Sequence, residues 1–208
     1  MSGNDQAARI YAFLGSSGCG KTTAMGKMLN KPRRKRTLVW SPKEAIDNYA
    51  AKWPGSVVVR SSVDVLMALK AAGKGEVHIV FVPPIERKSR EKLFDMTCQI
   101  AIKARNLTFI AEELHTVTRA NWAPDGWTEL VSMGRGYGIE IFGCSQRPAS
   151  MDKDFMGNCS LVRTGRLSYP EDGKTVAKSL GVPVDIVAKL NGFQYVQRDM
   201  NTGQITSG

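Results

Sequence analysis

The chain has 208 residues, of which 42% are hydrophobic and 23% charged, and this composition excludes a disordered or fibrous protein. No apolar run approaches the ~20 residues that a membrane-spanning helix needs, and the polar first ten residues show no secretory signal. We therefore expect an intracellular protein with a single domain over residues 1–208 and a substantial buried core.

The balance of charged residues favours a polyanionic partner. Lys and Arg number 29 against 19 Asp and Glu, which gives a net charge of +10. Such an excess is typical of proteins that bind nucleic acid or an anionic membrane surface, although it can also serve solubility alone. The four cysteines form no CxxC pair and there are only two histidines, so the sequence predicts neither a zinc site nor a disulfide framework.

Strand and helix patterns alternate along the first two thirds of the chain. Short apolar runs bounded by polar residues, Pro or Gly predict strands at 9–14, 37–40, 56–59, 76–82, 107–111 and 139–144. Helices are expected between them, at about 21–29, 42–51, 62–72 and 86–104. Pro42 can open the second helix, while Ser62 and Gly73 are the expected N-cap and stop of the third.

This alternation predicts an α/β fold. Repeated strand–helix crossovers imply a mostly parallel sheet flanked by helices on both faces. The helix at 86–104 should bury the face that carries Leu93, Thr97, Ile100 and Ala104. After residue 150 the pattern loosens, and the expected elements are helices at 175–180 and 184–190 and a small C-terminal β-hairpin of 193–198 with 204–207.

The residues that follow the first strand match the phosphate-binding pattern GxxxxGK[ST] in full. They are Gly15, Ser16, Ser17, Gly18, Cys19, Gly20, Lys21 and Thr22. The match lies in the required context, between a strand and a helix. Glycines let consecutive backbone N–H groups point at phosphate oxygens, and the helix N-terminus adds a favourable dipole. Lys21 should reach the β- and γ-phosphates and the Thr22 hydroxyl should ligate Mg²⁺, so ATP and Mg²⁺ are the predicted ligands.

A pair of carboxylates, Glu112 and Glu113, ends the apolar strand at 107–111. This is the Walker B arrangement of P-loop proteins. Successive side chains on a strand face opposite ways, so the two acids can do different work. Glu112 would hold the metal and Glu113 would orient and deprotonate the attacking water. The alternative is that both are solvated acids at a strand end.

A polar amide, Gln146, lies just beyond the strand at 139–144. At the tip of a strand beside the Walker B strand, it is placed to sense the γ-phosphate or to hold the attacking water. A glutamine at a strand end is often only a surface residue, so this prediction depends on the position of Gln146 beside the Walker B strand.

The segment around this strand resembles a known superfamily. Residues 133–139 read MGRGYGI, and the strand is followed by Ser145, Gln146, Arg147 and Pro148. This block is similar to the GR-x-x-GI…TQRP block of the FtsK–HerA translocases. The Glu112–Glu113 pair and the segment 190–193, LNGF, are similar to the same superfamily. Because the chain is short, it most resembles the genome-packaging ATPases of tailless, membrane-containing icosahedral viruses.

The resemblance implies a RecA-like (ASCE) P-loop fold, a ring that is usually a hexamer, and ATP-driven movement of double-stranded DNA into a preformed capsid. It places the protein in the cytoplasm of the host cell and at the packaging vertex, docked to a capsid or membrane protein of the virion. It also implies an arginine that reaches into the neighbouring subunit's site. Arg135 matches the block best, with Arg147, Arg163 and Arg166 as alternatives.

Two segments are candidates for sequence-independent DNA contact. Residues 27–36 hold six basic residues and no acid, which suits phosphate contact. The stretch 115–132, with Arg119, Trp122 and Trp127, could supply a loop in the central pore. The first can equally be a solvated basic loop, and the tryptophans of the second can pack in the core.

Three other functions remain open. A filamentous-phage assembly ATPase of the Zot-like kind would respond to a membrane assembly protein instead of DNA. A small-molecule kinase would turn over ATP only with an acceptor, and the second carboxylate, Glu113, argues against it. An inactive nucleotide-binding subunit would bind ATP without turnover.

Overall fold

A computed structural model describes residues 9–208, and within them nine strands form one sheet. The strands are β1 (Ile10–Leu14), β2 (Arg36–Trp40), β3 (Val57–Val59), β4 (Val77–Phe81), β5 (Thr108–Ala111), β6 (Glu140–Ser145), β7 (Leu161–Thr164), β8 (Val196–Asp199) and β9 (Ile205–Ser207). Their spatial order is β3-β4-β2-β5-β6-β1-β7-β8-β9. Neighbours from β3 to β7 are parallel, and β8 and β9 add an antiparallel hairpin. The predicted α/β class, parallel sheet and terminal hairpin are confirmed.

Strand β6 lies between β1 and β5. The strand that ends at Gln146 therefore separates the strand of the phosphate-binding loop from the strand that ends at the two carboxylates. This order brings the three sequence motifs to adjacent positions along one edge of the sheet.

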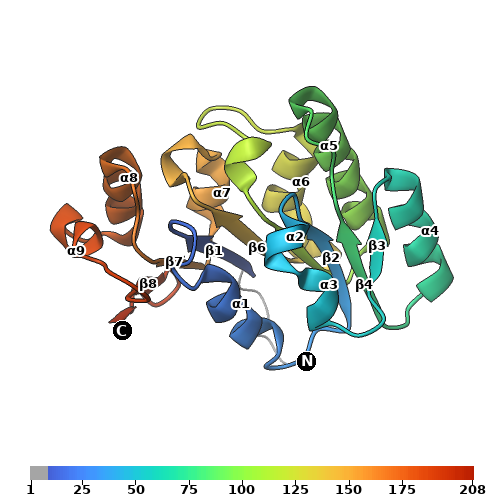
Figure 1. Cartoon of the computed structure of the whole chain (residues 1–208), viewed down its shortest axis with the longest axis horizontal. Coiled ribbons are helices and arrows are strands. Elements are labelled where there is room, and N and C mark those ends of the chain that lie inside the picture. The colour runs from blue at the N-terminus through green and yellow to red at the C-terminus, as the bar shows by residue number, and fades with distance from the viewer. Residues whose placement is uncertain (1–8) are drawn as a thin grey trace.

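Helices cover both faces of the sheet (Figure 1). They are α1 (Lys21–Leu29), α2 (Glu44–Asp47), α3 (Tyr49–Lys52), α4 (Ser62–Ala72), α5 (Arg87–Ala104), α6 (Asp125–Met133), α7 (Lys153–Asn158), α8 (Pro170–Leu180) and α9 (Val184–Ala188). Short 3₁₀ turns are η1 (Leu114–Thr116), η2 (Gly134–Tyr137) and η3 (Pro148–Ser150). In Figure 1, α1, α2 and α3 lie in front of the sheet, and α8 and α9 lie beside β7 and β8.

The core consists of two apolar layers that the strands separate by alternation. On β1, Phe13 belongs to the layer that contains Met25 of α1, whereas Leu14 belongs to the layer of α4 to α9. On β6, Phe142 and Ile141 divide in the same way. Since successive side chains on a strand point to opposite faces, almost continuous apolar strands can serve both layers.

Several boundaries differ from the sequence predictions. The helix expected at 42–51 is broken at Asn48, which has a φ of 47°. The N-cap of α4 is Ser61 and not Ser62, because the Ser61 hydroxyl accepts a bond from the Asp64 N–H. Gly73 ends that helix as expected.

The buried face of α5 is displaced from the predicted one. The fully buried residues are Phe94, Thr97, Cys98 and Ala101, while Leu93, Ile100 and Ala104 are only partly buried. Phe94 is the largest of these side chains and packs against Trp40. Its burial shifts the buried face of α5 by about one residue from the predicted face.

Two helices and one strand have no counterpart in the sequence prediction: α6, α7 and β7. Strand β7 is four residues long and only half of its side chains are buried, so its apolar pattern is weak. Helix α8 begins at Pro170, five residues before the expected start, and strand β8 begins only at Val196.

In the described part of the chain no helix is long and apolar enough to cross a membrane. All four cysteines are free and buried. The predicted lack of a secretory signal concerns residues that lie largely outside the described range.

Candidate nucleotide-binding site

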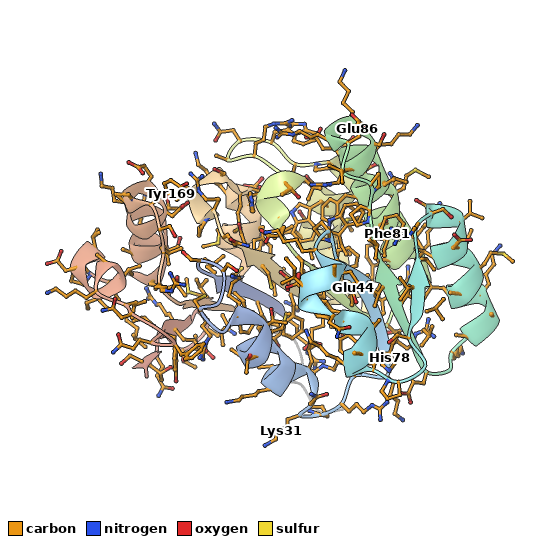
Figure 2. The ribbon with its side chains drawn as sticks, viewed as in Figure 1. Lys31, Glu44, His78, Phe81, Glu86 and Tyr169 are labelled. Atoms are coloured by element: carbon orange, nitrogen blue, oxygen red, sulfur yellow. The ribbon has the colours of Figure 1, made fainter. Side chains whose placement is uncertain are left out.

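Five loops meet at the carboxyl edge of the sheet, where β1, β2, β5, β6 and β7 end. The loops begin at Gly15, Ser41, Glu112, Gln146 and Gly165. Figure 2 labels Glu86 and Tyr169 on this side of the molecule and Lys31 on the opposite side. In parallel α/β sheets this edge is the usual place for a ligand.

The phosphate-binding loop is fixed by backbone bonds to its neighbours. The Gly15 N–H donates to the Ser145 carbonyl at 3.1 Å, and the Ser16 N–H donates to the Arg166 carbonyl at 2.9 Å. Gly15 has a φ of 133°, and a Cβ there would lie 2.6 Å from Cys19 Sγ. Only glycine fits such a position.

Lys21 opens α1 and folds back over the loop. Its Nζ donates to the carbonyls of Gly15 at 2.7 Å and Ser16 at 3.0 Å. Thr22 follows in the first turn of the helix. The N-terminus of α1 and the ammonium group therefore lie together, an arrangement that attracts anions.

Glu112 is a buried carboxyl, 4% exposed. Its Oε1 accepts a hydrogen bond from the Tyr49 hydroxyl. Burial raises the pKa of Glu112 to about 7, while the Tyr49 bond and the Lys21 charge act in the opposite direction. Near neutral pH this carboxyl is partly protonated, and a bound cation would favour its ionised form.

Glu113 is buried to the same extent and has a φ of 55°, a left-handed conformation that is rare for residues other than glycine. Its Oε1 accepts bonds from Lys43 Nζ and Gln146 Nε2, both at 2.5 Å. Its Oε2 is buried without a hydrogen bond among the described residues, and the His115 ring lies 3.4 Å away. The structure thus brings Glu113 and Gln146 together and leaves one carboxylate oxygen free to accept a proton.

Sequence reasoning missed three residues around the carboxylates: Tyr49, Lys43 and His115. The His115 ring lies 3.1 Å from the Ser145 hydroxyl, and burial lowers the pKa of its imidazole. Lys43 follows the carboxyl end of β2, so its place after a predicted strand was an available signal. Tyr49 reaches Glu112 only because of the break between α2 and α3, which the sequence pattern does not show.

The loop after β7 also supports the phosphate-binding loop. Arg166 Nη2 donates to the Ser17 carbonyl at 2.9 Å, and the hydroxyls of Ser168 and Ser16 are 2.7 Å apart. Because β7 was not predicted, this loop could not be placed beside the site.

The arginines proposed to act on a neighbouring subunit lie at different places. Arg135 is exposed in η2, before β6, at the edge opposite its own phosphate-binding loop. Arg147 lies at the carboxyl edge, bonded to the buried Asp172 at 2.9 Å and stacked on the ring of Tyr169 at 3.9 Å. Arg163 is stacked on Tyr195. The role of each in a neighbouring site stays a prediction.

The basic segment 27–36 lies at the amino edge, and its arginines are engaged within the chain. Arg34 pairs with Glu140 at 2.6 Å in a mostly buried contact, Arg33 pairs with Glu76, and Arg36 donates to two loop carbonyls. Among the described residues, the side chains of its three lysines make no hydrogen bond or ion pair. These are Lys27, Lys31 and Lys35.

The two tryptophans of the segment 115–132 differ in burial. Trp127 is fully buried, and its Nε1 donates to Asp152 Oδ2 at 3.1 Å, so it is a core residue. Trp122 is 42% exposed with the Arg119 guanidinium 4.6 Å from its ring. A role in a pore loop stays a prediction for Trp122 and Arg119 alone.

Comparison with known proteins supports the fold. No protein-family model matches the chain. Protein P9 of Pseudoalteromonas phage PM2 is 23% identical over 183 residues, which make up 88% of this chain and 80% of P9. The genome packaging NTPase B204 from Sulfolobus turreted icosahedral virus 2, in complex with AMPPCP, superposes with a TM-score of 0.73 at 14% identity over 96% of both chains. VirB4 of Thermoanaerobacter pseudethanolicus gives a TM-score of 0.70 at 9% identity over 100% of this chain and 90% of VirB4. These similarities confirm the predicted α/β fold, which the chain shares with the genome packaging NTPase B204 and with VirB4.

Proposed function

We propose that the protein binds ATP with Mg²⁺ at the carboxyl edge of the sheet and hydrolyses it to drive double-stranded DNA into a preformed viral capsid. The main support for ATP hydrolysis is the position of Glu113. This buried carboxylate is held by Gln146, which follows the strand between β1 and β5, and its second oxygen accepts no hydrogen bond from the residues that the structure describes.

The phosphates are bound by the loop from Gly15 to Thr22. Backbone N–H groups, the N-terminus of α1 and the Lys21 ammonium group supply positive charge to the triphosphate. Removal of this charge would weaken binding and slow cleavage together.

The donor groups at this edge fit Mg²⁺. Thr22 and Glu112 offer hard oxygen ligands, and Mg²⁺ is usually held by one or two such groups together with phosphate oxygens and water. When bound, the ion would neutralise charge on the β- and γ-phosphates.

Glu113 is the general base. Its Oε2 takes the proton of a water whose oxygen bonds to the γ-phosphorus, the bond to the β–γ bridging oxygen breaks, and ADP and phosphate are the products. Gln146 and Lys43 hold Oε1 and so fix which oxygen faces the water. A kinase would protect the phosphoryl group from water, which this arrangement does not favour.

The coupling to DNA rests on the fold neighbours and on charge. B204 is described as a genome packaging NTPase, P9 is a phage protein, and the net charge of +10 suits a polyanion. We infer a ring of subunits, six by resemblance, that works in the host cell at the packaging vertex and contacts a capsid or membrane protein of the virion. In that ring an arginine from the neighbouring subunit, Arg135 by its motif, would complete each site.

The test is an ATPase assay at low salt with and without duplex DNA of unrelated sequences, with a mass measurement of the oligomer in each sample. We expect DNA of any sequence to stimulate hydrolysis, and the stimulation to fall steeply as salt rises. Hydrolysis that ignores DNA would contradict the packaging function and leave the ATPase intact. A requirement for a small-molecule acceptor would contradict both.

A further inference from the structure

The hydroxyl of Tyr49 is buried against one of the two carboxylates of the carboxyl edge. Tyr49 is 1% exposed, and its hydroxyl donates a hydrogen bond to Glu112 Oε1. A phenylalanine would fill the same space without burying a polar atom that needs a partner. The hydroxyl is therefore not required for packing, and what it contributes is the bond to Glu112.

The segment between β2 and α3 fixes the position of Tyr49. Ser41 follows β2, and its N–H donates to the Phe81 carbonyl at 2.9 Å. The Glu44 carboxylate accepts bonds from the Ser41 hydroxyl at 2.7 Å and from the Ala50 N–H at 2.8 Å. Glu44 thus ties the first turn of α3, which begins at Tyr49, to the carboxyl end of the sheet.

Two neighbouring side chains hold the ring of Tyr49. The Trp53 ring is stacked with it at a centroid distance of 6.1 Å, and Lys52 Nζ lies 4.0 Å from the ring centre. Because the backbone and the ring are both held, the hydroxyl is a rigid donor. The orientation of the Glu112 carboxyl group follows the hydroxyl, and not the reverse.

Glu112 needs a rigid donor more than an aspartate would. The acid that holds the metal on the Walker B strand of P-loop NTPases is commonly an Asp, whereas Glu112 has one more rotatable bond. The last torsion of a glutamate side chain is also broad, so its rotamer does not fix the plane of the carboxyl group. Mg²⁺ demands near-ideal octahedral geometry. The bond from Tyr49 to Oε1 sets this plane, so the carboxyl group is oriented before a cation binds.

We propose that Tyr49 is a positioning residue for the magnesium site, and that its hydroxyl orients the Glu112 carboxyl group to hold Mg²⁺. The proposal rests on the proposed site for ATP and Mg²⁺ and adds the residue that sets its affinity for the cation. Tyr49 acts through Glu112 alone, so nucleotide binding without Mg²⁺ should not depend on the hydroxyl.

The experiment measures the dissociation constant of a non-hydrolysable ATP analogue in EDTA and in excess Mg²⁺, and ATP turnover as a function of Mg²⁺ concentration. The proteins are the wild type, Tyr49→Phe, which keeps the ring and removes only the hydroxyl, and a matched control, Tyr11→Phe. Tyr11 is a partly buried tyrosine of β1 that lies beside Glu140 at the amino edge. A thermal melt in EDTA verifies that each variant is folded.

We expect Tyr49→Phe to reduce the gain in analogue affinity that Mg²⁺ provides by roughly 10- to 100-fold, the usual effect of losing a group that orients a metal ligand. The Mg²⁺ concentration for half-maximal turnover should rise by a similar factor. The affinity in EDTA should stay within twofold of the wild type, and Tyr11→Phe should match the wild type throughout.

A folded Tyr49→Phe protein with the Mg²⁺ dependence of the wild type, or with an equal loss of affinity in EDTA and in Mg²⁺, would overturn the role of Tyr49. If Tyr49→Phe does not fold, Glu44→Ala decides in its place, because it keeps the hydroxyl but releases the first turn of α3 and should shift the Mg²⁺ dependence in the same direction. Wild-type protein whose analogue affinity and turnover ignore Mg²⁺ would instead refute the magnesium site itself.

Discussion

Buried carboxylates lie at both edges of the sheet, and they differ in how completely they are paired. At the amino edge, Glu140 accepts two bonds from Arg34, at 2.6 and 2.7 Å, and one from the Thr108 hydroxyl at 2.9 Å. At the carboxyl edge, one oxygen of Glu113 has no hydrogen bond within residues 9–208, and burial raises the pKa of Glu112 to about 7. The paired Glu140 is therefore expected to serve stability, while a buried carboxylate with an unbonded oxygen (Glu113) or a raised pKa (Glu112) is a candidate for chemistry.

The basic residues of segment 27–36 also differ in how they are paired. The segment 27–36 is the most basic part of the sequence, yet its arginines hold the amino edge together. Its lysines make no hydrogen bond or ion pair among the described residues, so they are the first candidates for phosphate contact. Within this basic segment the arginines make contacts inside the chain, and the lysines remain available to bind phosphate.

The largest expected effect is that of Glu113→Gln at the carboxyl edge. The amide cannot take a proton from water, so ATP turnover should fall roughly 10²- to 10⁴-fold. Nucleotide binding and the melting temperature should stay close to those of the wild type. A steady-state phosphate-release assay and a binding titration measure both, and retained turnover would place the base elsewhere.

The matched change at the amino edge is Arg34→Met. It leaves Glu140 buried without its cation, so the free energy of unfolding should fall by about 3–5 kcal/mol. Turnover per folded molecule should be unchanged, because no atom of the pair reaches the phosphate-binding loop. Urea unfolding gives the first quantity and an ATPase assay the second. A stable Arg34→Met protein that lost turnover would reverse the roles of the two edges.

The pH dependence of stability in Glu112→Gln tests the second carboxylate of the carboxyl edge. The pKa of Glu112 rises from 4.5 to about 7 on folding, so its contribution to stability is fully present below pH 4.5 and is lost as the pH rises through about 7. The glutamine does not titrate. Without Mg²⁺ or nucleotide, the variant should therefore gain stability relative to the wild type between pH 5 and pH 8, by up to about 3 kcal/mol. A stability difference that stays constant across this range would show that Glu112 is ionised throughout.

The smallest effect is expected from Lys31→Ala combined with Lys35→Ala. Loss of two phosphate contacts should weaken duplex DNA binding uniformly across sequences and reduce the slope of log affinity against log salt by roughly 2. The control is Lys174→Ala with Lys178→Ala on α8, which removes the same charge from two exposed positions outside segment 27–36. Equal losses in both double variants would mean that only net charge matters.

Much of the site could be predicted from local sequence. The phosphate-binding loop and the residues Glu112, Glu113 and Gln146 each follow a strongly apolar strand, and parallel strands bring their carboxyl ends together. Local patterns did not predict the contact of Tyr49 with Glu112, because the position of Tyr49 depends on the left-handed Asn48 between two short helices. They also missed Ser168 and Arg166, because β7 is short and half polar and is recognisable only through its pairing with β1 and β8.

The central claim is that the carboxyl edge hydrolyses ATP, and the most direct test is turnover by Lys21→Ala beside the wild type at saturating Mg²⁺ and ATP. Loss of the ammonium group from the phosphates should lower turnover by roughly 10²-fold or more, with an unchanged fold by circular dichroism. Near-normal hydrolysis by Lys21→Ala would contradict the account.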